Sequence, residues 1–233
     1  MTLKDCFEQN GLSLYLTDEK EEKLYLLCSL LIEYNKKVNL TALDTPAEIY
    51  AKHIADSAKL LPFLSECKTL LDVGCGGGFP SLPAAILNEN ISVTAMDATK
   101  KKLDFVLYAK EQLGLDNITV LNGRAEELCR DGLRESFDAV TARAVASLPV
   151  LCELCIPYVK TGGRFLAMKT DKKELLSAKN AVLQTGAELE KCVEYALICE
   201  NETADRCIMI FKKTKHTAQK YPRKYPIIRS HPL

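Results

Sequence analysis

A glycine-rich loop after a short apolar run is the feature of this 233-residue chain with the clearest chemical meaning. The segment 70–80 reads LLDVGCGGGFP, which predicts a strand that ends near Asp72, then a loop and a helix. Glycines in such a loop let the backbone bend sharply and pass close to a bound ligand. The candidate ligand-binding residues here are Asp72, Gly74, Gly76, Gly78 and Phe79.

Asp97 ends the next apolar run, SVTAMD, about 20 residues beyond the loop. An acid in this place accepts the ribose hydroxyls of an adenosine ligand, in dinucleotide enzymes and in methyltransferases alike. The loop separates the two classes, because the dinucleotide fingerprint needs a third glycine where this chain has Phe79. The pattern favours S-adenosylmethionine as cofactor over a strand-to-helix turn with coincidental glycines.

The segment after the fourth expected strand narrows the methyl acceptor. Amine methylation commonly uses a Pro-Pro-aromatic turn there, whereas this chain has TARAV at 141–145. Carbon methylation of pyrimidines needs a cysteine nucleophile, usually in a Pro-Cys or Thr-Cys pair, and neither pair occurs. A ring nitrogen such as N7 of guanine carries a free lone pair and needs only in-line placement against the sulfonium methyl.

From about Leu31 to its C-terminus the chain resembles a known family, the bacterial small-subunit ribosomal RNA methyltransferase G family, also called glucose-inhibited division protein B. The resemblance rests on seven segments: KVNLTA (37–42), HIADS (53–57), DVGCGGGFPSLP (72–83), GRAEE (123–127), FDAVTARAVASL (137–148), LAMK (166–169) and YPR (221–223). It implies a Rossmann-like fold and transfer of a methyl group from S-adenosylmethionine to N7 of one guanine in 16S ribosomal RNA.

Carried over residue by residue, the resemblance implies that Gly74 and Phe79 line the cofactor. It also implies that Asp97, Ala98 and Thr99 contact the cofactor's ribose and that Ala125 and Glu126 contact its adenine. Arg143 would lie at the methyl-transfer end. The chain departs from the family pattern in ATKKKLDF after Asp97, where a Lys-Arg pair is more usual, and in its last residues, IIRSHPL. These departures concern the contacts of the tail and not the chemistry.

Three cationic residues, Arg124, Arg143 and Lys169, follow expected strand ends. In open α/β sheets that edge is where ligands bind. We assign these candidate catalytic residues to orienting the cofactor carboxylate, RNA phosphates or the target guanine, because a cation cannot stabilise the positive charge that N7 acquires. The alternative for the two arginines is an ordinary surface ion pair.

The elements that must position these residues alternate between short apolar runs and helical stretches from Thr69 onward. This alternation predicts a doubly wound, mostly parallel sheet over residues 61–213, the α/β fold of Rossmann-like class I methyltransferases. The expected strands are 70–73, 91–96, 118–121, 137–141 and 163–168, and the expected helices are 81–87, 100–113, 148–159 and 172–184. Two later runs, 190–199 and 206–212, predict an antiparallel hairpin at the edge.

Residues 1–60 are expected to form a helical extension packed on this domain. Between Asp18 and Ala58 apolar residues recur three and four apart, which predicts two or three helices there. The segment 45–48 has the form of a helix start, with Pro at the first helical position. Asn39, His53 and Asp56 form either a lid over RNA or cofactor or a local hydrogen-bonded cap, and both interpretations stay open.

Residues 214–233 form a basic tail, and from Lys212 onward the chain contains no acid. Tyrosines suited to base stacking are interleaved with the cations, which favours binding of RNA phosphates over a solvated, disordered end. The candidate RNA-binding residues are Lys212, Lys213, Lys215, Lys220, Arg223, Lys224 and Arg229.

The composition of the chain restricts its possible partners and its cellular compartment. Basic and acidic residues balance at 31 each, so any recognition charge must be local. The ten cysteines follow no apolar leader, which favours a reducing cytoplasm with packed thiols, and Cys152 and Cys155 suit helix packing better than zinc. We expect no membrane span, no metal, a monomer, and 16S rRNA or the small ribosomal subunit as partner.

Two other functions fit the same fold, since a fold does not fix an activity. One is methylation of a small molecule. The other is a protein that keeps the cofactor loop but only docks on the ribosome.

Overall fold

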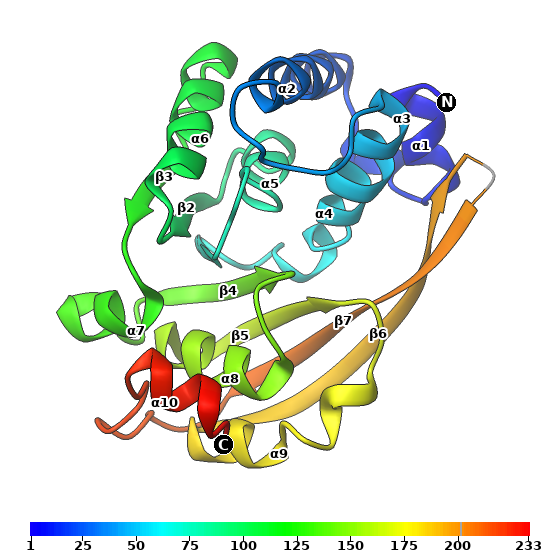
Figure 1. Ribbon diagram of the computed structural model, residues 1–233. Coiled ribbons are helices and arrows are strands. Elements are labelled where there is room, and N and C mark those ends of the chain that lie inside the picture. The colour runs from blue at the N-terminus through cyan, green and yellow to red at the C-terminus, as the bar shows by residue number, and fades with distance from the viewer. Residues whose placement is uncertain (201) are drawn as a thin grey trace.

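The computed structural model describes residues 1–200 and 202–233, which form a seven-stranded sheet between two layers of helices (Figure 1). The strand order is β3-β2-β1-β4-β5-β7-β6. The first five strands are parallel, whereas β7 runs antiparallel to both β5 and β6. This confirms the predicted α/β sheet with its antiparallel edge hairpin. The strands are β1 Thr69–Val73, β2 Ser92–Asp97, β3 Ile118–Asn122, β4 Phe137–Arg143, β5 Val159–Lys169, β6 Ala187–Cys199 and β7 Glu202–Lys213.

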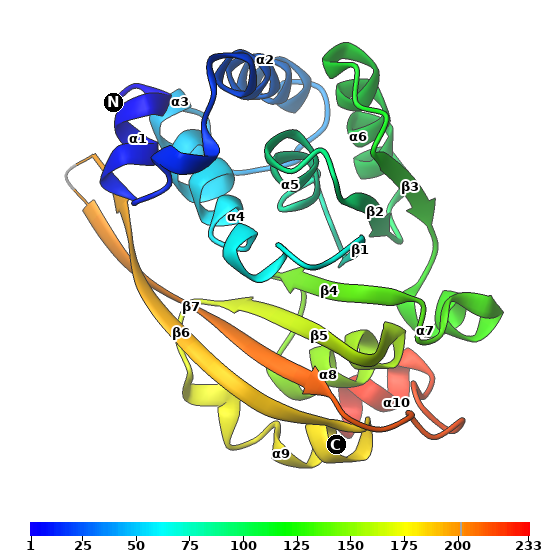
Figure 2. The same ribbon diagram turned by 180° about the vertical axis from the view of Figure 1, so that it is seen from behind.

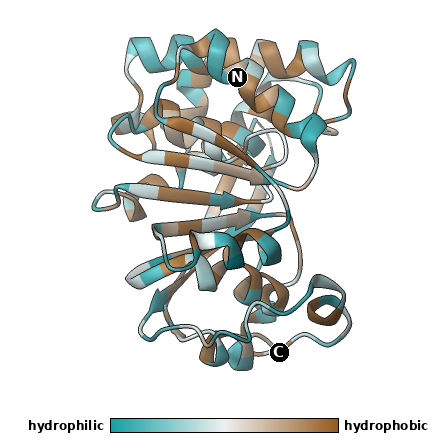
Figure 3. Cartoon of the chain, turned by 90° about the vertical axis from the view of Figure 1, so that its left-hand side faces the viewer, coloured by the Kyte–Doolittle hydropathy of each residue, from teal (hydrophilic) through white to brown (hydrophobic). Residues whose placement is uncertain are grey.

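The helices cover the two faces of the sheet, as Figures 1 and 2 show from opposite sides. One hydrophobic cluster joins one face to α1, α2, α4, α5 and α6, and a second joins the other face to α8, α9 and α10. Figure 3 shows hydrophobic positions along the central strands and hydrophilic ones on the outer helices. The helices are α1 Leu3–Gln9, α2 Asp18–Asn35, α3 Pro46–Glu48, α4 Asp56–Ala58, α5 Ser81–Leu87, α6 Lys100–Leu113, α7 Ala125–Leu128, α8 Leu148–Cys155, α9 Lys179–Gln184 and α10 Tyr225–Ser230.

Most predicted elements lie within a few residues of their observed bounds, and α5 and α6 match at both ends. Two predicted helices were too long. The helix expected over 148–159 ends at Cys155, because Pro157 has no N–H to continue it, and Val159 already belongs to β5. The helix expected over 172–184 is a short 3₁₀ turn followed by α9 from Lys179.

The N-terminal helices begin at side-chain caps. The unpredicted α1 has a capping box, in which Thr2 accepts from the Asp5 N–H and Asp5 accepts from the Thr2 N–H. Thr45 caps the predicted start at Pro46. From there α3 runs through a π-helical turn, Ile49–Ala55, into α4. Such turns often occur at functional sites.

The last two strands and the tail return to the body of the molecule. The Asn10 side chain exchanges two hydrogen bonds with the backbone of Ile198, so α1 holds the far end of the β6–β7 hairpin. The tail, residues 214–233, lies against α8 and contains α10. No helix among the described residues has both the length and the apolar character needed to cross a membrane.

Candidate active site

A cavity of about 320 Å³ opens at the carboxyl ends of β1 to β4. It brings together six of the predicted cofactor and orienting residues: Gly74, Asp97, Ala98, Arg124, Ala125 and Glu126. The sequence missed the rest of its wall: Val73, Met96, Lys102, Gly123, Ala144, Val145, Leu154 and Tyr225. The cavity lies at the edge where open α/β sheets bind ligands, as predicted.

The glycine loop is fixed to β2, because the N–H groups of Gly74 and Cys75 both donate to the Met96 carbonyl, at 2.8 and 2.9 Å. Gly74 has a φ of +76°, and a Cβ there would lie 2.6 Å from Val145. Gly76 also has a positive φ, but a Cβ there would meet no protein atom within 4 Å. The loop thus needs glycine for its shape and leaves open space above Gly76.

Asp97 is held in place by backbone N–H groups. Its Oδ2 accepts from Gly76 at 3.0 Å and its Oδ1 accepts from Thr99 at 2.8 Å. The side chain is almost buried but lines the cavity. The carboxylate is therefore oriented toward the cavity before any ligand binds.

Replacing Asp97 with Ala should weaken S-adenosylmethionine binding about 10- to 100-fold, since ribose hydroxyls would lose bonds to a charged group. Calorimetric titration of the full chain measures this, with the exposed Asp116→Ala variant as the matched control. Unchanged affinity in a folded Asp97→Ala variant would remove Asp97 from the site.

Asp72 lies behind the loop and is completely buried. Its Oδ2 accepts hydrogen bonds from both the backbone and the hydroxyl of Ser81, which ties β1 to the start of α5. Burial raises the pKa of Asp72 to about 7, against the opposing effect of the Ser81 hydrogen bonds.

Six residues predicted to bind the cofactor do not line this cavity, and their direct contact with the cofactor stays a prediction: Asp72, Gly76, Gly78, Phe79, Thr99 and Arg143.

A second cavity, of about 350 Å³, lies between the π-helical turn, the ends of β4 and β5, and the hairpin. It is lined by Lys52, His53, Asp56, Arg143, Ala144, Met168, Lys169, Thr170, Tyr195 and Arg206. Ala144 lines both cavities and has a φ of +55°, a left-handed conformation that strains a residue with a Cβ. The two cavities therefore meet at a strained residue directly after Arg143.

Arg143 lines the second cavity and is held there by side chains and backbone from the N-terminal helices. Its Nη1 donates to the Lys52 carbonyl at 2.8 Å and to Asp56 Oδ2 at 3.0 Å, and its Nη2 lies 3.0 Å from His53 Nδ1. Asp56 Oδ1 accepts from the Tyr195 hydroxyl at 2.8 Å. The surface ion pair considered for Arg143 is thus wrong, because both partners are largely buried.

His53 is held in one tautomer. An arginine always donates, so His53 Nδ1 accepts from Arg143 and Nε2–H donates to the Thr41 hydroxyl at 2.8 Å. Burial and the Arg143 charge lower the His53 pKa to about 3, so the ring is neutral at physiological pH. The ring stacks on Phe79, with centroids 4.6 Å apart.

These contacts place two of the three N-terminal residues. His53 and Asp56 line the second cavity and bond to Arg143 on β4, so they are more than a local cap, whereas a role as a lid over RNA or cofactor stays a prediction. Asn39 is exposed and lines neither cavity.

Lys169 closes the second cavity on the β5 side. Its Nζ donates to the Ala146 carbonyl at 3.1 Å and lies 3.0 Å from Glu174 Oε2. Glu174 also accepts from the Leu148 N–H at the start of α8. The sequence did not single out Glu174, which connects this lysine to the loop after β4.

Arg124 lies between two cavities. Its guanidinium is 5.9 Å from the centroid of the Tyr225 ring, and both residues line the first cavity and a neighbouring cavity of about 540 Å³. That neighbouring cavity is also lined by Glu126, Glu127, Arg130, Arg223, Lys224 and Pro226. The basic tail therefore contributes directly to the edge of the site.

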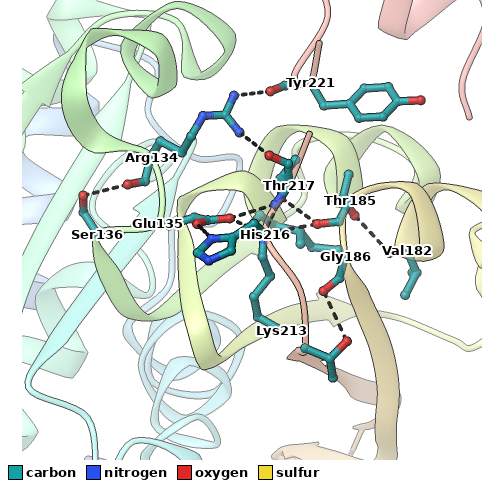
Figure 4. Close-up of polar contacts among 12 residues, drawn as sticks. Arg134, Glu135, Ser136, Val182, Thr185, Gly186, Lys213, His216, Thr217 and Tyr221 are labelled. Carbon is teal, nitrogen blue, oxygen red and sulfur yellow. Dashed lines mark hydrogen bonds and ion pairs between the residues drawn. The ribbon is translucent and has the colours of Figure 1, made fainter. Parts of the chain in front are cut away.

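Lys213 was predicted to contact RNA, and the structure contradicts this. Its side chain is completely buried, with Nζ donating to the carbonyls of Ile156 and Thr185 and to the Thr217 hydroxyl. Glu135 is 3.2 Å away, and burial lowers the Lys213 pKa. Figure 4 shows this ammonium surrounded by its acceptors, so Lys213 anchors the tail and cannot reach a phosphate.

The cysteines are free thiols, and most are buried. Cys152 and Cys155 are completely buried in α8, which agrees with the predicted packing role, and burial raises the pKa of both thiols. Among residues 1–200 and 202–233, no three His, Cys, Asp or Glu side chains gather in a way that could hold a metal ion.

The sequence matches one protein family along most of its length. The family model GidB, rRNA small subunit methyltransferase G, matches residues 20–201. The Ribosomal RNA small subunit methyltransferase G of Clostridium botulinum strain Eklund 17B is 40% identical, over 98% of this chain and 97% of that protein. The protein of the same name from Streptococcus gordonii is 41% identical, over 94% and 93%.

Solved structures at low identity support the fold alone. M. jannaschii TYW2 in complex with AdoMet superposes with a TM-score of 0.58 at 13% identity, covering 76% of this chain and 80% of that chain. Precorrin-6y C5,15-methyltransferase from Geobacter metallireducens gives a TM-score of 0.53 at 20% identity, covering 68% and 86%. The fold is therefore that of class I methyltransferases.

Proposed function

This chain belongs to the rRNA small subunit methyltransferase G family, and we propose that it transfers a methyl group from S-adenosylmethionine to N7 of one guanine in 16S rRNA. The single observation that supports this reaction most is the meeting of two cavities at Ala144. One has the features of a cofactor site. The other is lined by cations and aromatic rings that suit a nucleotide.

The first cavity fits S-adenosylmethionine. The Asp97 carboxylate lines this cavity, where it would accept hydrogen bonds from the ribose hydroxyls. We assign Ala125 and Glu126, at the start of α7 on the cavity wall, to contacts with the adenine. The cofactor supplies an electrophilic methyl group on a sulfonium.

The second cavity would hold the guanine. Methylation at N7 removes no proton in the transfer, so the site needs no general base there, and a neutral His53 suits this chemistry. We propose that Arg143 and Lys169 orient the base and neighbouring phosphates, with Asp56 fixing the direction of Arg143. Arg124 serves the cofactor side.

Labelled methyl transfer tests this function. Small ribosomal subunits from cells that lack the enzyme would be incubated with labelled S-adenosylmethionine, and the RNA then cleaved at 7-methylguanosine. One labelled guanine in 16S rRNA is the expected result. Cofactor binding without any label in the RNA would favour a small-molecule substrate or a docking role.

We propose that exposed tail cations, and not Lys213, contact RNA phosphates. Replacing Lys215 with Ala should reduce the slope of log affinity against log salt by about 0.7 for single-stranded RNA. Binding of a 16S fragment measured between low and high salt gives this slope. The Lys23→Ala variant on α2, in the opposite helix layer, should keep the parent slope, and an unchanged slope for Lys215→Ala would remove that residue from the RNA surface.

We further propose that the protein acts as a monomer in the cytoplasm on 16S rRNA within the small subunit or its precursors. The charge balance of the whole chain is neutral, so docking would depend on local cations. Comparing label uptake by naked 16S rRNA and by assembled subunits distinguishes the possible substrates.

A further inference from the structure

The tail crosses the molecule as an anchored strap, which we define as residues 217–233. Arg134 donates to the backbone carbonyls of Thr217 and Tyr221, as Figure 4 shows. Arg130 donates to the Pro222 carbonyl at 2.7 Å. Both arginines come from the connection between α7 and β4, so the first part of the strap is held against the segment that follows α7, and the first residues of α7 line the cofactor cavity.

A buried ion pair fixes the next part of the strap. Arg223 donates from Nε and Nη2 to the two carboxylate oxygens of Glu153, at 2.8 and 2.6 Å, and its backbone N–H donates to the same carboxylate. The Glu153 side chain is completely buried in α8. Its neighbour Leu154 lines the cofactor cavity, so this pair sets the distance between the strap and that cavity.

Tyr225 follows this anchor by two residues and lies on the cavity wall together with Ala125 and Glu126. Arg124 stands beside the Tyr225 ring, at 5.9 Å from its centroid, which is a cation–π distance. An aromatic ring on this wall offers a flat apolar surface beside the residues placed for adenine. An aromatic side chain that stacks on a base increases the binding affinity measurably, whichever base it contacts.

We propose that Tyr225 is a cofactor-binding residue whose ring packs against the adenine of S-adenosylmethionine, and that the strap completes the cofactor site. This inference rests on the proposed function, because it takes the cavity as the S-adenosylmethionine site. The tail would then have a role apart from RNA binding. From the sequence alone, its tyrosines were expected to stack on RNA bases.

The test measures cofactor affinity in the absence of RNA. Calorimetric titration of the full chain with S-adenosylmethionine should show an increase in Kd of about 10-fold for Tyr225→Ala, whereas Tyr225→Phe keeps the parent value. Tyr225→Leu, which fills the space without an aromatic face, should lie between them. Ile227→Ala, on the same helix but exposed and outside the cavity wall, is the matched control.

A fragment of the cofactor locates the contact. The same variants titrated with 5′-methylthioadenosine should show the same loss, because this probe keeps the adenine and lacks the amino-acid carboxylate. A loss seen with S-adenosylmethionine but not with the fragment would overturn the adenine assignment. Parent affinity in both Tyr225→Ala and Tyr225→Leu would overturn the proposal as a whole, whereas a parent protein that binds neither compound would instead contradict the proposed function.

Discussion

Arg143→Ala should lower single-turnover methyl transfer to small ribosomal subunits by about 100-fold or more. A hydrogen bond to a charged group contributes about 1.5–3 kcal/mol, and each 1.4 kcal/mol corresponds to a factor of ten in rate. Arg143 makes three such contacts, with Lys52, Asp56 and His53, so its loss leaves the second cavity without its ordering cation. Asp56 keeps its bond from Tyr195, so the chain should still fold.

Two further variants make this prediction specific. Arg143→Lys keeps the charge but loses the planar fork, and we expect it to recover only a minor part of the activity. Arg164→Ala, which breaks a partly exposed ion pair between the middle of β5 and Glu190 of β6, should leave the rate unchanged. A parent rate in a folded Arg143→Ala protein would exclude Arg143 from the transfer step.

Arg223→Ala should destabilise the fold by about 3–5 kcal/mol, although Arg223 belongs to a segment that reads as a surface tail. The reason is Glu153, whose buried carboxylate would lose its partner. Urea unfolding followed by circular dichroism measures the change in the free energy of unfolding.

The matched control is Arg229→Ala, an exposed cation of α10, which should change stability by less than about 0.5 kcal/mol. Replacing the pair together, as Arg223→Met with Glu153→Leu, should recover most of the loss because no buried charge remains. If Arg223→Ala were as stable as Arg229→Ala, the ion pair would not hold the strap.

The sequence was sufficient to predict the parts of the site that consist of local motifs on neighbouring strands. The glycine loop and Asp97 lie on adjacent strands whose ends must meet in a parallel sheet, so their proximity follows from the pattern of elements. The same holds for Arg143 and Lys169 at the ends of β4 and β5. Periodicity and turn residues predicted the strands and the two long helices of this region.

The sequence was not sufficient where a role depends on a distant partner. Lys213 and Arg223 look like RNA-binding cations, but Lys213 is itself buried 3.2 Å from Glu135, and Arg223 pairs with the buried Glu153, which lies 70 residues before it. The wall position of Tyr225 depends on the same packing. The π-helical turn that brings His53 to Arg143 has no periodic signature in the sequence. Its residues could therefore be named as candidates for a functional role, but their contact with Arg143 could not be predicted.

The position of β7 between β5 and β6 has a consequence for how the chain must be synthesised. β6 precedes β7 in the chain, but within the described sheet β6 pairs only with β7. β7 also pairs with the edge of β5 that faces away from β4. A nascent or truncated chain that stops after residue 200 would therefore present the edge of β5 and an unpaired β6, both able to pair with other chains. Nonsense mutations that stop the chain shortly after residue 200 should thus yield aggregation-prone products.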